Sequence, residues 1–272
     1  EPEDQAPAAG EEVCPACADP IDAEALDVKR VLEERITSIL PIDGYDENQF
    51  IFMATAKGTV KKTAATQFSR QRSVGLRAIE LDEDDVLVGT AITDGNSDIM
   101  LFSTEGKATR FNEGQVRAMG RTARGVRGIN LASGHKLISL IVPKESGRIL
   151  TVTENGYGKR TENAEFPAKG RGGKGVIAMS TSERNGSLVG AVQVWDGDEM
   201  MLISNQGTAV RTRVDEVSLL GRNTQGVRVI RTRDGEALVS VSRIAEDDDA
   251  AEPVQAVVTD ENSDSGSNET EE

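Results

Sequence analysis

Short apolar runs alternate with polar turns along most of the chain, and four of these runs share one pattern. Each begins with an apolar run, continues through a turn that contains glycine, and ends in a second run with basic residues. This pattern predicts a β-hairpin with the glycine at positive φ. The four segments are FIFMATAKGTVKKT (50–63), IMLFSTEGKATRF (99–111), ILTVTENGYGKRT (149–161) and MMLISNQGTAVRT (200–212).

A second set of segments, rich in glycine, follows the hairpins at the same spacing. Its members are RSVGLRAI, RTARGVRGI, GRGGKGVIAM and GRNTQGVRVI. Their glycines Gly75, Gly125, Gly175 and Gly226 are 50, 50 and 51 residues apart, and the turn glycines Gly58, Gly106, Gly156 and Gly207 are 48, 50 and 51 apart. A third apolar run closes each unit, and ITSILPI (36–42) is the same kind of run ahead of the first. The chain therefore contains an internal repeat of about fifty residues.

A unit of this length with four short strands predicts a propeller blade. Runs such as FIFMAT are apolar at successive positions, which favours sheets covered on both faces by neighbouring sheets. We expect an all-β fold of four-stranded blades over residues 34–245. The predicted blades span about residues 36–89, 90–140, 141–190 and 191–245.

The charge is divided unevenly along the chain. The net charge is −15, but residues 1–35 carry −8, residues 246–272 carry −11, and the segment between them carries +4. Acidic ends with few apolar residues are typical of disorder. We expect residues 1–33 to be a flexible acidic insertion or linker and residues 246–272 to be a disordered acidic tail. That tail either occupies a basic surface of the middle segment in cis or serves only to solubilise the chain.

Few residues suggest catalysis, a metal or a nucleotide. Cys14 and Cys17 form a lone C-x-x-C, which indicates either two reduced thiols or half of an intermolecular metal site. The box Lys169 to Gly175 satisfies G-x-G-x-x-G only literally, because apolar β-branched residues and not a helix follow it. One histidine and no paired carboxylates leave no catalytic acid and base to nominate. No apolar run is long enough to span a membrane, so we expect a cytoplasmic protein without a cofactor or metal of its own.

Basic residues recur at equivalent positions of the units, which predicts a positive band around the assembly. Aromatic residues make up only 3% of the chain, so such a band suits the phosphates of duplex DNA better than stacked bases. The glycines of the box allow the backbone to approach a phosphate closely. The simpler alternative is that strands end in charged residues because they end in water. The predicted DNA-binding residues are Lys61, Lys62, Arg110, Arg121, Arg124, Arg127, Lys159, Arg160, Lys169, Arg171, Lys174, Arg211, Arg222 and Arg228, with the box glycines Gly170, Gly172, Gly173 and Gly175.

Over residues 34–245 the chain resembles the C-terminal domain of the DNA gyrase A protein. The resemblance rests on GTVKKT, VRAMGRTARGVRGI, NGYGKRT, ERNGSLVGAVQV and LLGRNTQGVRVIRT, and on the last five residues of the box, which match the family's glycine- and lysine-rich box. It implies a β-pinwheel of normally six blades, of which four are present, with duplex DNA bent around its basic rim. It further implies that the chain acts with the rest of gyrase A and with gyrase B in an A2B2 enzyme. ATP and Mg²⁺ serve that whole enzyme in negative supercoiling, and the domain with the catalytic tyrosine is absent from this chain.

Two alternatives remain beside this hypothesis. The first is the topoisomerase IV counterpart, which binds DNA without a strong wrap. The second is a propeller that binds another protein, which predicts loops of apolar or mixed character and little dependence on salt.

Overall fold

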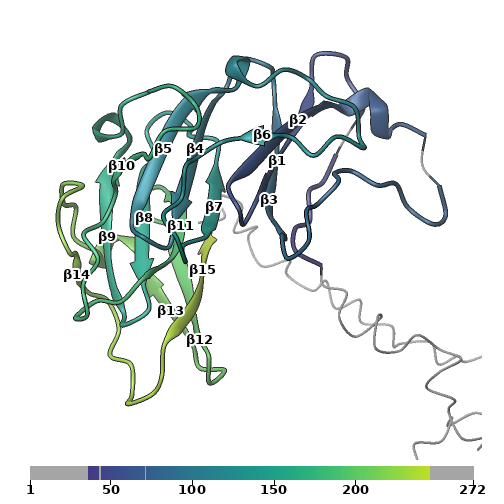
Figure 1. Cartoon of the computed structure of the whole chain (residues 1–272). Helices are drawn as coiled ribbons and strands as arrows, with labels where there is room; N and C mark the ends of the chain where they lie inside the picture. Colours follow the sequence, from purple (N-terminus) through teal and green to yellow (C-terminus); the bar gives the residue numbers. More distant parts are fainter. Residues whose placement is uncertain (1–35, 43, 71, 246–272) are drawn as a thin grey trace, which may run out of the picture.

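The computed structural model describes residues 36–42, 44–70 and 72–245, which form a succession of antiparallel sheets (Figure 1). Each sheet is built on one hairpin. The four hairpins are β1 (Phe50–Thr55) with β2 (Thr59–Ala64), β4 (Asp98–Ser103) with β5 (Lys107–Asn112), β8 (Arg148–Thr153) with β9 (Tyr157–Glu162), and β12 (Glu199–Ser204) with β13 (Ala209–Arg213). The predicted repeat of hairpins is confirmed. The expected acidic segments at the two ends lie outside the described residues.

The third apolar run of each unit forms the innermost strand of its sheet. These strands are β3 (Leu87–Thr93), β7 (Leu137–Ile141), β11 (Leu188–Val194) and β15 (Leu238–Ile244), and each pairs with the first strand of its hairpin. Consecutive innermost strands lie side by side, β3 with β7, β7 with β11, and β11 with β15. The boundaries drawn from the sequence near residues 89, 140 and 190 fall inside these strands.

The outermost strand of a sheet comes from the next unit along the chain. The strands β6 (Val126–Arg127), β10 (Val176–Ile177) and β14 (Val227–Arg228) pair with β2, β5 and β9 of the preceding sheets. Each unit is thereby linked to its predecessor by main-chain hydrogen bonds. The last sheet, in the order β13-β12-β15, has three strands among the described residues, which contain no later unit to supply a fourth. The expectation of four strands therefore holds for three of the four sheets.

The apolar core lies between neighbouring sheets and not within one sheet. Phe52, Leu101 and Phe111 belong to a cluster between the first two sheets, and Phe102 meets Phe166 of the third unit edge-on with 5.9 Å between ring centroids. Full burial of a side chain of this size is worth about 1.5–3 kcal/mol. Strands that are apolar on both faces therefore stabilise the stacking of sheets, as the sequence pattern predicts.

Short 3-10 turns follow the outer strand of each hairpin and mark the contact with the neighbouring sheet. They are η1 (Ala65–Phe68), η2 (Glu113–Gln115), η3 (Asn163–Glu165) and η4 (Val214–Glu216). Residues 36–42, expected as a strand, form none, although Ser38 Oγ lies 2.8 Å from Thr90 Oγ1 on β3. Within the described ranges no helix is long and apolar enough to cross a membrane.

Candidate nucleic-acid interface

Three loops cross over the second strands of the first three hairpins, which are β2, β5 and β9. Both ends of each loop are attached to the same strand. One end forms an antiparallel pair and the other a parallel bridge, so that the loop passes over a single side chain. We call residues 118–126, 168–176 and 219–227 the arches. The antiparallel pairs are Val60 with Val126, Ala108 with Val176, and Gly158 with Val227, and the bridges are Lys62 with Ala118, Arg110 with Ala168, and Arg160 with Leu219. The side chains under the arches are those of Lys61, Thr109 and Lys159.

The recurring second glycine is required by the close approach of the arch to the strand beneath. Gly175 has φ +76°, and a Cβ at that position would lie 2.5 Å from the carbonyl oxygen of Ala108. No side chain fits there without moving the backbone. Gly173, by contrast, has no atom closer than 3.8 Å to its position for a Cβ, so space does not restrict it. The box sequence is thus partly a requirement of the arch itself.

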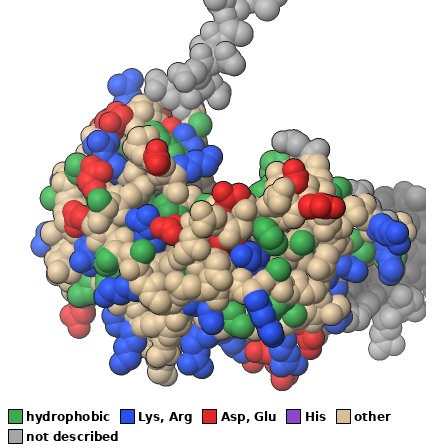
Figure 2. Space-filling model, turned by 90° about the horizontal axis from the view of Figure 1, so that it is seen from above, with side chains coloured by type: hydrophobic (Ala, Val, Ile, Leu, Met, Phe, Trp, Pro, Cys, Tyr) green, Lys and Arg blue, Asp and Glu red, His purple; other side chains and the backbone are tan. Residues whose placement is uncertain are grey.

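Exposed basic side chains lie on the arches and directly after two of them. Lys169, Lys174, Arg127 and Arg228 are exposed, as is Arg124, which pairs with Glu80 at 3.1 Å and Asp82 at 2.8 Å. Among the described residues no ion pair is found for Lys169, Lys174 or Arg127. In the space-filling view, blue side chains gather along the lower edge of the visible face, with red ones between them (Figure 2).

One arginine in each arch connects it to the preceding unit. The guanidinium groups of Arg121, Arg171 and Arg222 each donate a hydrogen bond to a backbone carbonyl of the preceding unit. The acceptors are the carbonyls of Arg77, Arg127 and Ile177, respectively. Each acceptor lies two residues after the recurring second glycine of its unit. These three arginines are only partly exposed. They join consecutive arches into a continuous rim.

A residue that sequence reasoning missed anchors each arch from below. Gln67, Gln115 and Glu165 accept a hydrogen bond from the backbone N–H of Arg121, Arg171 and Arg222 at 3.2, 2.8 and 2.9 Å. Their spacing matches that of the repeat, so aligning the units beyond their glycines and basic residues would have found them.

The structure places Lys61 and Lys159 in the interior, although both were predicted to bind DNA. Their side chains are fully buried, and their ammonium groups donate to backbone carbonyls of the loops above them. Burial, together with the positive Arg121, lowers the pKa of Lys61 to about 8. Burial also lowers the pKa of Lys159 to about 8, with Glu165 opposing the shift and Arg222 adding to it. These ammonium groups are therefore not available to a phosphate.

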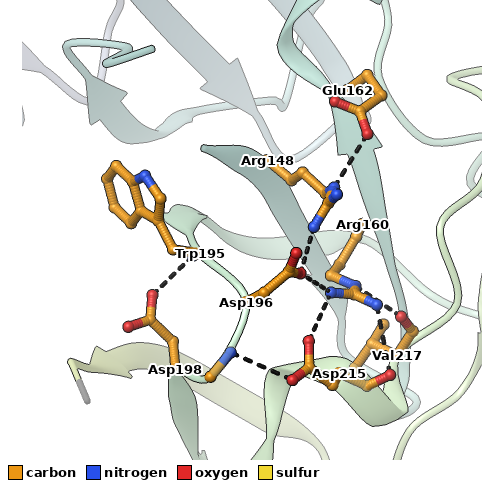
Figure 3. Close-up of polar contacts among 9 residues, drawn as sticks. Arg148, Arg160, Glu162, Trp195, Asp196, Asp198, Asp215 and Val217 are labelled. Carbon is orange, nitrogen blue, oxygen red and sulfur yellow. Dashed lines mark hydrogen bonds and ion pairs between the residues drawn. The ribbon is translucent and has the colours of Figure 1, made fainter. Parts of the chain in front are cut away.

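The residue that follows the buried position on each strand also contacts protein. We call this residue, Lys62, Arg110 or Arg160, the clasping position, because its side chain holds the 3-10 turn of the following unit. Lys62 reaches the carbonyl of Glu113 at 3.1 Å, and Arg110 reaches that of Asn163 at 3.2 Å. Arg160 donates to the carbonyl of Val217 at 2.8 Å and pairs with Asp215 and Asp196, each at 3.0 Å (Figure 3). The expectation of one exposed band therefore fails for Lys61, Lys62, Arg110, Lys159 and Arg160, which lie in the seams between sheets.

Arg211 occupies the clasping position of the fourth unit, and the described residues contain no following turn for it to hold. Its side chain is 60% exposed and pairs with Glu199 on the neighbouring strand. It lines an open depression together with Gly197, Arg213 and Asp215. Over the described ranges, no cluster of three His, Cys, Asp or Glu residues could hold a metal ion, and Cys14 and Cys17 lie outside those ranges.

The family profile and the similar sequences point to the same protein family. The profile of the family described as DNA gyrase C-terminal domain, beta-propeller, matches residues 49–94, 97–144, 147–194 and 198–245, one stretch for each sheet. The DNA gyrase A protein of Salmonella typhimurium is 56% identical over 227 residues, which cover 83% of this chain and 26% of that protein. The gyrase A protein of Pseudomonas aeruginosa is 60% identical over 197 residues, or 72% of this chain and 21% of that protein. The chain thus spans about a quarter of the length of these relatives.

Two solved structures share the fold. A DNA gyrase A C-terminal domain aligns with a TM-score of 0.70 at 27% identity, over 80% of this chain and 74% of that one. The C-terminal domain of a DNA topoisomerase IV aligns with a TM-score of 0.74 at 26% identity, over 84% of this chain and 70% of that one.

Proposed function

The chain belongs to the DNA gyrase C-terminal domain family, and from that premise we propose that its rim of arches binds duplex DNA without regard to sequence and bends it. The observation that carries the proposal is the repetition of exposed basic side chains on consecutive arches or directly after them: Arg124 and Arg127, then Lys169 and Lys174, then Arg228. Contacts of this kind neutralise phosphates, release counterions and position the duplex.

The arches suit a backbone contact better than a base contact. They contain no aromatic residue to stack on a base, and the backbone is exposed at Gly170 and Gly173. Successive arches are joined by the arginine-to-carbonyl bonds, so their charges keep a fixed spacing along the rim. A rim of that kind favours a duplex that follows its curve, as in other proteins that bend DNA by phosphate contacts alone.

Within a whole type IIA topoisomerase, we propose that this chain contributes the wrap and the rest of the enzyme contributes the chemistry. The wrap would give the captured duplex a handed crossing, which strand passage converts into negative supercoils. ATP and Mg²⁺ would then be used by the remainder of gyrase A and by gyrase B, in the bacterial cytoplasm.

The test is a ligation experiment with nicked circular DNA. The nick is sealed with the chain bound, the protein is removed, and the linking number is measured at several salt concentrations. A positive shift that grows with bound protein and disappears at high salt supports handed wrapping. Binding that depends on salt but leaves the linking number unchanged supports the second candidate, a domain that holds DNA without a strong wrap, which the likeness to a topoisomerase IV domain favours. If the chain shows no salt-dependent binding to DNA, both candidates are contradicted.

A further inference from the structure

The seams contain two fully buried ammonium groups, those of Lys61 and Lys159, and neither forms an ion pair with a carboxylate of the described residues. We propose, building on the proposed DNA-binding function, that Lys61 and Lys159 are positioning residues: their ammonium groups hold the following arch through its carbonyl oxygens and so orient the basic side chains that meet DNA.

The contacts of Lys159 are concentrated on one arch. Its Nζ lies 2.8 Å from the carbonyl oxygen of Gly221, 2.5 Å from that of Arg222, and 3.1 and 3.2 Å from the carbonyl and hydroxyl oxygens of Thr224. These oxygens are more than sixty residues away in sequence. A single cation therefore gathers the carbonyls on both sides of the arch arginine, and it fixes the backbone from which that arginine projects.

Lys61 makes the same kind of contact two seams earlier, and it binds carbonyls of two loops. Its Nζ donates to the carbonyl oxygen of Arg121 in the arch and, at 2.6 Å, to that of Ala78 in the first unit. The arch arginine is again the residue whose carbonyl is held. Burying an ammonium without such acceptors would be costly, and carbonyls turned toward a gap would lose their partner as well. The lysine and the arch therefore depend on each other.

The middle arch lacks this device and provides an internal comparison. Thr109 stands where the other two strands have lysine, and its side chain is too short to reach across an arch as an ammonium does. The anchoring residue below it is the neutral Gln115, whereas the Lys159 arch has Glu165. The middle arch also holds Gly170, Gly172 and Gly173. We expect the backbone of this arch to change conformation most easily of the three, although the arch is attached to its strand in the same register as the others.

The test compares hydrogen exchange of the arches in the whole chain, without DNA, in the wild type and in the Lys159→Met variant. Methionine keeps most of the buried volume and removes the donor. We expect amides of residues 219–227 to exchange about tenfold faster, because a network worth about one to three hydrogen bonds is lost. Amides of residues 168–176 and of β8 should keep their rates. Lys136→Met, at an exposed position away from the arches, is the matched control.

A pH series distinguishes positioning by the charged group from packing of the lysine stem. Glu165 and Arg222 are the charged groups that face Lys159, and Arg121 faces Lys61. After correction for intrinsic exchange, the protection of residues 219–227 in the wild type should rise as pH rises from about 8, because opening the arch exposes the ammonium of Lys159 to water and the open form then binds more protons than the closed form. Lys159→Met should show no such step. This wild-type measurement decides the matter even if the variant fails to fold.

DNA binding is then measured separately on the same proteins, by titrating a labelled duplex of random sequence. Faster exchange in the arch together with several-fold weaker binding supports the proposal. Unchanged exchange in Lys159→Met, or exchange that accelerates with no loss of affinity, overturns it. A wild type that shows the pH step but binds no DNA overturns the proposed function instead, so the two failures are distinguishable.

Discussion

The seams between sheets and the arches on the rim carry basic residues at the same repeat spacing but use them in opposite ways. In the seams, Lys62 and Arg160 satisfy carbonyls and carboxylates of the following unit and have little exposed surface. On the arches, Lys169 and Lys174 face solvent. A positive charge that repeats in sequence therefore marks the assembly of the units as well as a ligand surface. Only the position relative to the strand end separates the two uses.

The largest expected effect comes from removing the buried carboxylate of the first seam. Glu113 is fully buried and accepts from Thr93 Oγ1 at 2.8 Å and from the N–H groups of Gly95 and Ser97, each at 2.9 Å, with Lys62 Nζ at 3.5 Å. Glu113→Ala would leave these donors without an acceptor and the buried ammonium of Lys62 without its carboxylate. We expect the free energy of unfolding to fall by about 3–5 kcal/mol, as measured by urea denaturation.

The control for that variant is a carboxylate in a more exposed pair. Glu105 pairs with Lys107 at 2.5 Å, with both side chains about a quarter exposed. Glu105→Ala should change stability by no more than about 1 kcal/mol. Equal losses in the two variants would mean that burial does not distinguish the seam from the surface.

The second prediction uses the clasping position of two units. Arg160 has 12% of its side chain exposed and holds the fourth unit through Val217, Asp196 and Asp215, whereas the equivalent Arg211 is 60% exposed and holds no later unit among the described residues. Arg160→Ala should cost about 2–3 kcal/mol, since its hydrogen bonds are charge-assisted and several are lost together. Arg211→Ala should cost at most about 0.5 kcal/mol. A similar loss of urea midpoint in both would contradict the distinction between the seam and the open end.

The sequence was sufficient for the hairpins, their period and the all-β class, because glycine turns and apolar runs depend on local geometry. It could not show that β6, β10 and β14 cross to the preceding sheet, since a two-residue strand has no pattern of its own. For the same reason Lys159 and Lys174 looked alike: each is a lysine near a glycine, and only the arch passing over one of them decides which is buried. The anchoring Gln67, Gln115 and Glu165 were visible in the repeat but are polar residues of an ordinary kind.

The third prediction concerns DNA and not stability. Lys169→Ala with Lys174→Ala removes two outward charges from the middle arch, while the backbone bonds that hold the arch remain. Affinity for duplexes of different sequence should fall by a similar factor of about ten at low salt, and the slope of log affinity against log salt should shrink by about one to two. The unfolding midpoint should stay the same.

Lys136→Ala with Lys144→Ala is the matched control for that variant. Both lysines lie outside the arches, so the net charge changes equally while the rim is untouched. The control should lose clearly less affinity. An equal loss would mean that the overall charge, and not the rim, governs binding, and a change in sequence preference would contradict a phosphate contact.

The last prediction is a pH dependence of global stability that belongs to the lysines under the arches. Burial lowers the pKa of Lys61 and Lys159 in the folded chain to about 8, against 10.5 for an unburied lysine. Between about pH 8 and 10.5 the unfolded chain therefore binds more protons at these positions, so their contribution to the free energy of unfolding rises with pH. Urea denaturation from pH 7 to 10 should show this rise in the wild type relative to Lys159→Met, which lacks one of the two groups. The arch should become better protected over the same range, because its opening exposes the ammonium to water. A difference between wild type and variant that stays constant from pH 7 to 10 would mean that the folded chain retains the proton on Lys159.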